Sequence, residues 1–456
     1  MIMDVTFSEE AYDGMIASLF QRFPSFQKIG SGAYKPGIGN MVFFDGLTGH
    51  PHKKYMTIHV AGTNGKGSVS NMLASVCAVS GLRTGLYTSP HIIDFRERMR
   101  IIDADGSLRL ISKEEVWDFV SRWNGTFEHL DLSFFEITTM MAFDWFARQN
   151  VDVAVVETGL GGRLDSTNII SPEISIITNI GLDHCDMLGH TLSEIAFEKA
   201  GIIKPGVPAV VGESDPETDG VFERKVLYTN LPEPEFGGDR VRIMSLLTFA
   251  DKTEPSLWDR NMEILSSMDL QGEYQRKNLR TVLAAIDRLR AKGVLPESLE
   301  NGQVVGAIAS AAQRMDFHGR WEKVGDSPYI ICDIGHNSHG LKYNFSQLGK
   351  MMDSGEFNSL TIVYGAMADK DIDEIMKLFP EIAEIVFVTA SGKRAMKAGE
   401  IMERYVAAGR DPAKAVVSED LGSALRSLAG KARGLVYVGG STYLVSEAIP
   451  VLRDLY

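Results

Sequence analysis

The sequence has few cysteines and no long apolar run. Its 456 residues contain three cysteines, Cys77, Cys185 and Cys332, which are far apart and show no C-x-x-C spacing. Isolated thiols of this kind favour reduced, unpaired side chains. No stretch of about 18 apolar residues is present that could span a membrane, and the acidic N-terminus lacks the basic and apolar regions of a secretory signal. We therefore expect a cytoplasmic protein that does not bind membranes.

Positive charge is also scarce. The chain carries 46 lysines and arginines against 60 acidic residues, a net charge of −14, which argues against a nucleic-acid partner. If the substrates are anions, positive charge must be concentrated locally at the site. The composition, 44% hydrophobic and 23% charged, is that of a globular protein, and the length allows two or three domains.

Strand and helix patterns alternate along most of the chain, which predicts an α/β fold. Apolar runs without alternation, typical of strands in a parallel sheet covered on both faces, occur at 57–61, 151–158, 173–180, 329–333, 360–365, 384–389 and 434–439. Residues 275–292 show a strong helical pattern. We predict a first domain over 1–313, a linker or hinge over 314–323 and a second domain over 324–456. Residues 212–270 are polar and irregular, and we expect an inserted, mostly β portion there.

A glycine-rich turn follows the first of these strands. The segment GTNGKGS (62–68) lacks the first glycine of the common phosphate loop, and Gly67 stands between Lys66 and Ser68. A glycine-rich turn at a helix N-terminus still offers backbone N–H groups and the positive end of the helix dipole to a phosphate. The alternative is a strand-to-helix turn with an incidental lysine. The lysine, the serine and the strand–loop–helix context favour a nucleotide site.

Polar residues follow two further strands. Glu157 ends one strand, and Asp183 and His184 come just after another. α/β proteins bind ligands at the carboxyl ends of their strands, so Glu157 and His184 suit a Mg²⁺ site, although imidazole is an unusual Mg²⁺ ligand. The ordinary alternatives are an ion pair of Glu157 with Arg163 and a histidine that is merely a satisfied polar residue.

Lys199 lies on the apolar face of a helix whose start is marked by Thr191 and Glu194, a capping box. The common explanation for such a lysine is a stem that covers the core while the ammonium reaches water. The alternative is an inward, partly neutral lysine, because burial lowers the pKa of a lysine. A neutral amine can react with CO₂ to form a carbamate.

These segments together resemble the folylpolyglutamate synthase/dihydrofolate synthase family of Mur-ligase-like, ATP-dependent amide ligases. The motifs that carry the resemblance are HVAGTNGKGS (59–68), TSPHIIDFRERMRI (88–101), SFFEITTMMAF (133–143), VETGLGGRLDSTN (156–168), ITNIGLDHCDMLGHTLSEIAFEKAGIIKPGVP (177–208), QRKN (275–278), GRWE (319–322) and DIGHNSHG (333–340). In the last motif, isoleucine and serine replace residues more usual in the family. The resemblance implies a P-loop-containing, Mur-ligase-like central domain with a parallel sheet, followed by a smaller Rossmann-like α/β domain.

The resemblance also implies roles for particular residues. ATP binding falls to Gly62, Thr63, Asn64, Gly65, Lys66, Gly67, Ser68, Asn278, Arg320 and Asp333. Metal ligation, for two Mg²⁺ ions, falls to Ser89, Glu157 and His184. The catalytic residues are Lys66, Lys199 as a CO₂-derived carbamate, His184 and His336. The folate-type substrate is contacted by Ser133, Phe134, Phe135, Glu136, Leu164, Asp165 and Ser166.

The implied reaction joins L-glutamate to the carboxylate of dihydropteroate or a reduced folate, through an acyl phosphate, and yields ADP and phosphate. The resemblance favours a bifunctional, monomeric enzyme of folate biosynthesis. A single-activity folylpolyglutamate synthase and a cell-wall Mur ligase are alternatives, but only about 60 residues precede the phosphate loop, which is short of a usual domain. A slow nucleotide-hydrolysing switch protein is a third alternative, and the second α/β domain disfavours it.

Overall fold

The computed structural model describes residues 7–23, 35, 37–231, 240–368, 370, 372–392, 394–418, 420–428 and 433–456. The chain divides into two compact units. The first comprises Met1–Asp269 and Arg276–Asp316, and the second comprises Leu270–Gln275 and Phe317–Tyr456. The second unit is therefore discontinuous in sequence, because its segment Leu270–Gln275 lies between two parts of the first unit.

The first unit is built on an eight-stranded sheet. Its strands are β1 (Met56–Ala61), β2 (Thr84–Tyr87), β3 (Met99–Ile102), β4 (Leu108–Leu110), β5 (Val153–Glu157), β6 (Ile174–Ile177), β7 (Ala209–Val211) and β8 (Leu247–Phe249). Its helices are α1 (Glu9–Arg22), α3 (Gly39–Leu47), α4 (Lys66–Val79), α5 (Lys113–His129), α6 (Phe134–Arg148), α7 (Cys185–Leu188), α8 (Leu192–Ala200), α9 (Asp219–Asn230), α10 (Arg240–Met244), α11 (Asn261–Ser267), α12 (Gln275–Ala291), α13 (Asn301–Ala309) and α14 (Ala311–Met315).

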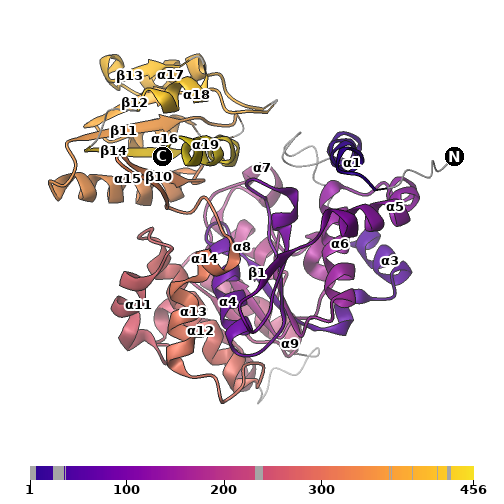
Figure 1. Cartoon of the computed structure of the whole chain (residues 1–456). Helices are drawn as coiled ribbons and strands as arrows, with labels where there is room; N and C mark the ends of the chain where they lie inside the picture. Colours follow the sequence, from indigo (N-terminus) through magenta and orange to yellow (C-terminus); the bar gives the residue numbers. More distant parts are fainter. Residues whose placement is uncertain are drawn as a thin grey trace. The chain divides into compact units, whose positions relative to one another are not determined.

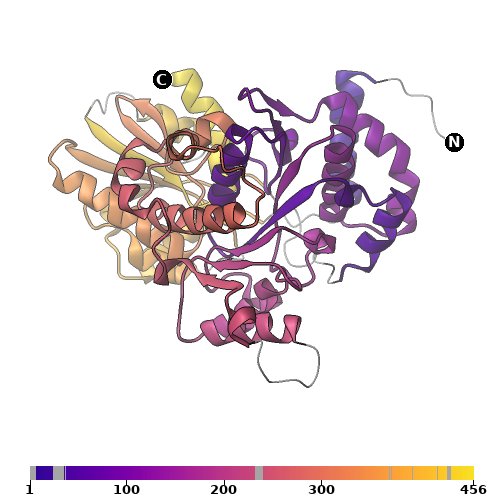
Figure 2. The ribbon, with the colours of Figure 1, turned by 90° about the horizontal axis from the view of Figure 1, so that it is seen from below.

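The strands of this sheet follow the order β4-β3-β2-β5-β1-β6-β7-β8. The run from β2 to β8 is parallel, and β3 and β4 add an antiparallel edge. Helices α4, α12 and α13 cover one face, and α3, α5 and α6 cover the other (Figures 1 and 2). Because both faces are covered, β2, β5 and β6 are buried along their whole length, and the unalternating apolar runs predicted this for β5 and β6.

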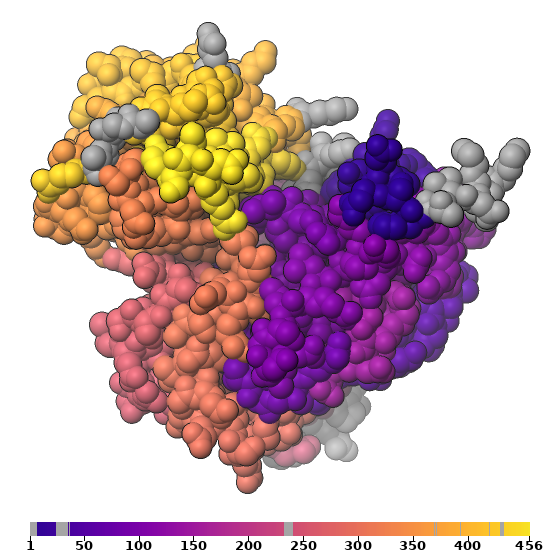
Figure 3. Space-filling view, viewed as in Figure 1, coloured from indigo at the N-terminus to yellow at the C-terminus, as the bar shows by residue number. Residues whose placement is uncertain are grey.

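An aromatic core fills the space under α3, α5 and α6. Its fully buried members include Phe44, Phe119, Phe127, Phe143, Trp145 and Phe146. On the opposite face, Ser75 of α4 donates a hydrogen bond to the carbonyl of Ala307 (2.8 Å) and accepts one from Arg314 Nε (3.0 Å). Arg314 also lies beside Gly106. Residues 300–316 therefore pack against the hairpin formed by residues 99–110 (Figure 3). This packing fixes the helix that begins at the glycine-rich loop.

The expectation of a mostly β insertion over 212–270 is wrong for the described part of that range. Residues 212–231 and 240–270 contain α9, α10 and α11, and β8 is the one strand in those two stretches. Residues 232–239 lie outside the described residues. The polar, irregular sequence did not indicate these helices because few of their residues are buried. β8 extends the parallel sheet beside β7.

The second unit has a six-stranded sheet in the order β13-β12-β11-β14-β10-β9. Its strands are β9 (Glu322–Asp326), β10 (Tyr329–Asp333), β11 (Ser359–Tyr364), β12 (Ala383–Phe387), β13 (Ala415–Val417) and β14 (Gly434–Gly439), and its helices are α15 (Ser338–Asp353), α16 (Ile372–Leu378), α17 (Ala398–Ala407), α18 (Leu421–Arg426) and α19 (Thr442–Leu455). All neighbours are parallel except β9 and β10. The four strands predicted for this part of the chain are present, and the doubly wound α/β fold class is confirmed.

Two simpler expectations can be checked directly. All three cysteines are free thiols, as predicted. Within the described residues, no helix combines the length and apolar character needed to cross a bilayer.

Candidate active site

The carboxyl ends of four neighbouring parallel strands carry the candidate site of the first unit. In the order β2, β5, β1, β6, these strands lead into Ser89, Glu157, the loop 62–65 and the segment 178–184. The register places Val60 beside Glu157 and Ala61 beside Ile177. The prediction that Glu157 and His184 follow strand ends on the same sheet edge as the phosphate loop is therefore confirmed for the strands that carry them.

The glycine-rich loop closes tightly between β1 and α4. Gly65 is the N-cap of α4 with φ +85°, a left-handed conformation that favours glycine. Gly65 has no side chain to cap the helix. A Cβ at Gly65 would lie 2.2 Å from Asn278 Oδ1 of α12. Asn278, predicted to contact the nucleotide, thus packs directly against the phosphate loop.

This close approach gives a testable prediction. We expect Gly65→Ala to raise the dissociation constant of ADP about tenfold or more, a loss of about 1.4 kcal/mol, because the new methyl group must displace Asn278 or the loop. The matched control is Gly81→Ala, since Gly81 has a similar φ of +96° but no atom within 4 Å of its added Cβ. Titration calorimetry and thermal melting of both variants would compare them. Equal ADP affinities in the two variants would contradict the prediction.

Two lysines converge on one carbonyl of the loop. Lys66 Nζ donates to the Gly62 carbonyl at 3.0 Å, and Lys199 Nζ of α8 donates to the same oxygen at 2.9 Å. Lys199 is 3% exposed. Burial, and then the charge of Lys66, lower the pKa of Lys199 from 10.5 to about 7. Of the two alternatives for Lys199, the structure shows the inward one, because the side chain is buried and its Nζ bonds within the protein.

Thr178 and Asn179, directly after β6, hold the phosphate loop by hydrogen bonds, and the sequence predicted no role for these two residues. The Asn179 carbonyl accepts from Thr63 N (3.0 Å), and Asn179 Oδ1 accepts from Asn64 N (2.9 Å). Thr178 Oγ1 donates to the carbonyl of Asn64, and Thr63 Oγ1 exchanges hydrogen bonds with Gly181. The sequence feature that could have predicted this contact is the polar pair Thr178–Asn179, which directly follows an apolar strand.

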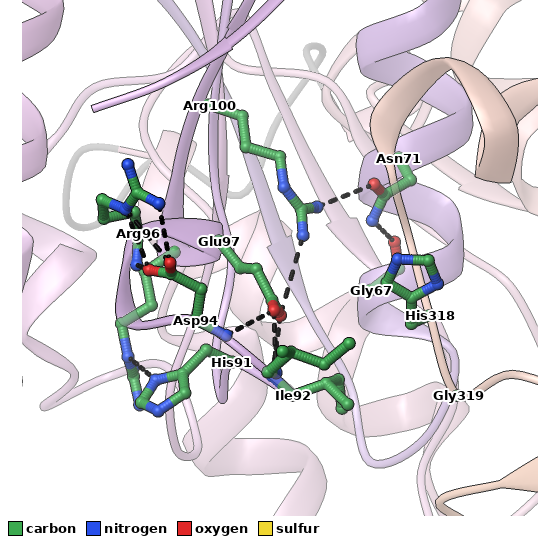
Figure 4. A network of polar contacts seen from close by, with 12 residues as sticks. Gly67, Asn71, His91, Ile92, Asp94, Arg96, Glu97, Arg100, His318 and Gly319 are labelled. Atoms are coloured by element: carbon green, nitrogen blue, oxygen red, sulfur yellow. Dashed lines mark hydrogen bonds and ion pairs between the residues drawn. The ribbon is translucent and has the colours of Figure 1, made fainter. Parts of the chain in front are cut away.

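Ser89 begins the loop after β2, which runs to the short helix η3 (Phe95–Arg98). The Glu97 side chain accepts three backbone hydrogen bonds, from Ile92, Ile93 and Asp94, each 2.7 Å long. Arg98 Nε donates to His91 Nδ1 at 2.9 Å, and burial lowers the pKa of His91 to about 3. Figure 4 shows this polar network beside α4. The buried carboxylate of Glu97 thus holds the backbone of the loop that carries Ser89.

The two other predicted metal ligands lie near the same edge. Glu157 is 4% exposed. Arg163 forms its ion pair with Glu198 of α8 (2.8 Å). His184 adopts a left-handed conformation, φ +55°, as the N-cap of α7, and its Nε2 lies 3.8 Å from Asp183 Oδ2. In the described part of the chain, no three His, Cys, Asp or Glu side chains are grouped as metal ligands, so a divalent ion here would need further oxygens from a substrate.

Several residues predicted to contact the folate-type substrate stabilise local structure. Ser133 and Glu136 form a capping box at the start of α6, with backbone-to-side-chain bonds of 3.2 and 2.7 Å. Phe134 is buried in the aromatic core and Phe135 packs against it. The Phe135 ring also touches Gly159, where a Cβ would lie 2.6 Å from it.

The rest of this predicted set lies in the loop after β5. Asp165 is buried and accepts hydrogen bonds from the backbone of Gly159, Leu160 and Thr167, each 2.9 Å. Burial raises the pKa of Asp165. Leu164 is half-buried and Ser166 is buried. Thr167 Oγ1 also contacts His59 Nε2 (2.8 Å), and burial lowers the pKa of His59, on the central strand β1, to about 3. Asp165 therefore shapes the loop rather than presenting a free carboxylate.

The remaining predicted residues belong to the second unit. Asp333 ends β10 and is 3% exposed. Its carboxylate accepts four hydrogen bonds, from Tyr274 Oη (2.8 Å), Trp321 N (2.8 Å), Gly335 N (2.7 Å) and Asn344 Nδ2 (2.8 Å). The Arg320 guanidinium lies 5.0 Å from the centre of the Phe317 ring, and His336 Nδ1 lies 3.0 Å from the Ile334 carbonyl. Roles for Arg320, Asp333 and His336 in nucleotide binding or catalysis stay predictions.

Comparison with known proteins decides the family. Residues 60–286 match the Mur ligase middle domain, and residues 319–442 match the Mur ligase glutamate ligase domain. The dihydrofolate synthase/folylpolyglutamate synthase of Bacillus subtilis (strain 168) is 32% identical over 429 residues, which cover 91% of this chain and 94% of that protein. The chain belongs to the dihydrofolate synthase/folylpolyglutamate synthase family. The family predicted from the motifs is thereby confirmed.

Solved structures of family members share the fold. The folylpolyglutamate synthase of Thermotoga maritima is 28% identical, with a TM-score of 0.73 and 98% of each chain covered. The bifunctional folylpolyglutamate synthase/dihydrofolate synthase of Yersinia pestis, solved with AMPPNP and a Mn ion, is 24% identical, with a TM-score of 0.76 over 97% of this chain and 98% of that one. These likenesses confirm a Mur-ligase-type central domain followed by an α/β domain.

Proposed function

We propose that this chain ligates L-glutamate both to dihydropteroate and to reduced folylpolyglutamates, with ATP converted to ADP and phosphate. As a member of the family it is an ATP-dependent ligase. The single observation that carries the proposal is the convergence of Lys66 and Lys199 on the Gly62 carbonyl, at the N-terminus of α4. Lys66 and the N-terminus of α4 place positive charge where a protein of net charge −14 must receive a nucleotide, and the buried Lys199 lies beside them.

The proposed chemistry has two steps. First, a carboxylate oxygen of the acceptor attacks the γ-phosphorus of ATP, which forms an acyl phosphate and releases ADP. Then the amino nitrogen of L-glutamate attacks the acyl carbon, an amide bond forms, and phosphate and a proton leave. Lys66 and the first-turn amides of α4 stabilise the charge that spreads over the phosphoryl oxygens in the first step.

The proposed metal residues fit this chemistry in part. A carboxylate from Glu157 and a hydroxyl from Ser89, together with phosphate oxygens, are the donor set that Mg²⁺ takes in nucleotide sites. His184 would serve a second ion, with Asp183 as its neighbour. Bound Mg²⁺ would supply charge neutralisation and orientation of the phosphates.

Lys199 is proposed to act as a carbamate. Its depressed pKa of about 7 leaves a large neutral fraction at neutral pH, and only the neutral amine attacks CO₂. The nitrogen–carbon bond forms as the amine loses a proton, and the product is an anion. We expect a carbamate resonance in ¹³C NMR spectra with ¹³C-bicarbonate that grows as pH rises through about 7 and is absent from Lys199→Met. A wild-type spectrum without it would exclude the carbamate.

The test of the proposed function is product mass. Purified protein is incubated with ATP, Mg²⁺ and L-glutamate, and with dihydropteroate or a reduced monoglutamyl folate in separate reactions. We expect one glutamate to be added to dihydropteroate and one or more to the folate. Addition to the folate alone would indicate a single-activity folylpolyglutamate synthase, and ATP consumption without either product would refute the folate-type acceptor.

A further inference from the structure

The loop that carries Ser89 is organised by one buried carboxylate. Glu97 is 5% exposed, and its two oxygens accept from the consecutive amides of Ile92, Ile93 and Asp94 at 2.7 Å each. Three short hydrogen bonds to one carboxylate fix the backbone of residues 92–94 (Figure 4). These residues lie three to five positions beyond Ser89, so Glu97 holds the far end of the loop that carries Ser89.

Arg100 balances this buried charge. It lies on β3, is 3% exposed, and places Nη2 4.0 Å from Glu97 Oε2. Burial lowers the pKa of Arg100, and the charges of Glu97, Asp316 and Glu157 act to raise it. Arg100 therefore lies within electrostatic range of both Glu97 and the candidate metal ligand Glu157.

A second contact of Arg100 leads to the phosphate loop. Its Nη1 lies 3.5 Å from Asn71 Oδ1, and Asn71 Nδ2 donates to the carbonyl of Gly67 at 2.7 Å. Asn71 is fully buried and stands one turn beyond Ser68 on α4. The contacts of Arg100 are longer than those of Glu97, so the Glu97-to-backbone bonds hold the loop, and Arg100 supplies the balancing charge between the loop and α4.

We propose that Glu97 is a positioning residue for the metal-binding hydroxyl of Ser89, and that the Glu97–Arg100–Asn71 network sets the place of that hydroxyl relative to the phosphate loop. The inference rests on the proposed function, in which Ser89 is a metal ligand. Residues that orient a metal ligand without touching the metal change metal affinity by about 10- to 100-fold when replaced. Loss of the Glu97 contacts should therefore weaken metal binding more than nucleotide binding.

Two substitutions test this. Glu97→Gln keeps the size of the side chain but leaves one acceptor oxygen for three amides, and Glu97→Asp keeps the charge that balances Arg100 but withdraws the carboxylate by one methylene. Ser89→Ala reports on the proposed metal site itself. The matched control is Arg96→Gln, which breaks the Arg96–Asp94 pair (2.8 Å) in the same loop at a part-exposed position.

The measurements are Mn²⁺ affinity in the presence of ADP, from the electron paramagnetic resonance of free Mn²⁺, and ADP affinity in EDTA. For both Glu97 variants we expect the Mn²⁺ dissociation constant to rise about 10- to 100-fold and ADP affinity in EDTA to stay within about twofold, with Arg96→Gln unchanged. A general structural role would instead weaken both affinities together.

The outcomes separate this inference from the proposed function. If Ser89→Ala loses Mn²⁺ binding while a folded Glu97→Asp keeps wild-type affinity, the positioning role of Glu97 is wrong and the metal site stands. If Ser89→Ala binds Mn²⁺ normally, Ser89 is not a ligand and the inference falls, while the metal site itself and the ligation reaction stand. If Glu97→Gln does not fold, Glu97→Asp decides, and failure of both to fold would make Glu97 a structural residue and overturn the inference.

Discussion

Replacement of Lys66 by methionine is expected to reduce kcat/KM for ATP by about 10²- to 10³-fold, the usual effect of removing one group that stabilises transition-state charge. Lys66 Nζ lies 3.0 Å from the Gly62 carbonyl and 3.3 Å from that of Thr63, at the start of α4, where a γ-phosphate would carry developing charge. Methionine keeps the length of the stem and removes the charge. Steady-state kinetics with a saturating acceptor would measure the effect.

A lysine outside the site provides the control for Lys66. Lys53 is exposed and lies in the turn before β1, so Lys53→Met makes the same chemical change without reaching the loop. We expect it to retain wild-type kinetics. If Lys66→Met kept kcat/KM within about threefold of wild type while remaining folded, this loop would not be the phosphate site that the proposed mechanism requires.

Replacement of Lys199 by methionine is expected to have opposite effects on activity and stability. Activity should fall about 10²-fold or more, because the side chain proposed to orient the metal or substrate is lost. Stability at neutral pH should rise, since the folded state of wild type disfavours the buried ammonium, and methionine fills a similar volume without charge. The remaining donor to the Gly62 carbonyl is Lys66.

The pH dependence of this stability difference has a definite sign. The pKa of Lys199 is lowered from 10.5 to about 7 on folding, so between these values the unfolded state binds the proton and the folded state does not. Wild-type stability therefore gains from this group as pH rises from about 7 to 10.5. Urea unfolding in CO₂-depleted buffer should show the largest advantage of Lys199→Met near neutrality and below, and a vanishing one at high pH.

Lys225 offers a matched comparison for Lys199. It is a half-buried lysine of α9 whose pKa is also lowered by burial, and no catalytic role is proposed for it. Lys225→Met should gain some stability without loss of activity. Wild-type kcat in Lys199→Met would show that Lys199 takes no part in ligation, whatever its effect on stability.

The sheet and the helices that follow its strands were predictable because their signals are local. Unalternating apolar runs marked β5 and β6, and Thr191 and Glu194 form the predicted capping box at the start of α8. The short helices of 212–270 were missed because few of their residues are buried, so they lack the periodic apolar face on which such a prediction depends.

Much of the site was also predictable, because strand order brings the carboxyl ends of parallel strands together. Glu157, His184 and the phosphate loop could be placed at one edge from their positions after strands, whereas Ser89 was assigned from the resemblance to the family. The hydrogen bonds that Thr178 and Asn179 make to the phosphate loop were not predicted, and neither was the network around Glu97. Both act through backbone amides and carbonyls, whose partners depend on loop geometry that residue types do not encode.

The segment Leu270–Gln275 makes the second unit discontinuous in the chain. Tyr274 supplies one of the four donors to Asp333, and Glu273 pairs with Lys350 of α15 at 2.7 Å. A fragment that begins at Phe317 would keep three donors to a buried carboxylate and lose the fourth, at a cost of about 1–3 kcal/mol. The second unit of this protein therefore cannot be excised or exchanged at a single junction, because six of its residues lie upstream, within the part of the chain that matches the Mur ligase middle domain.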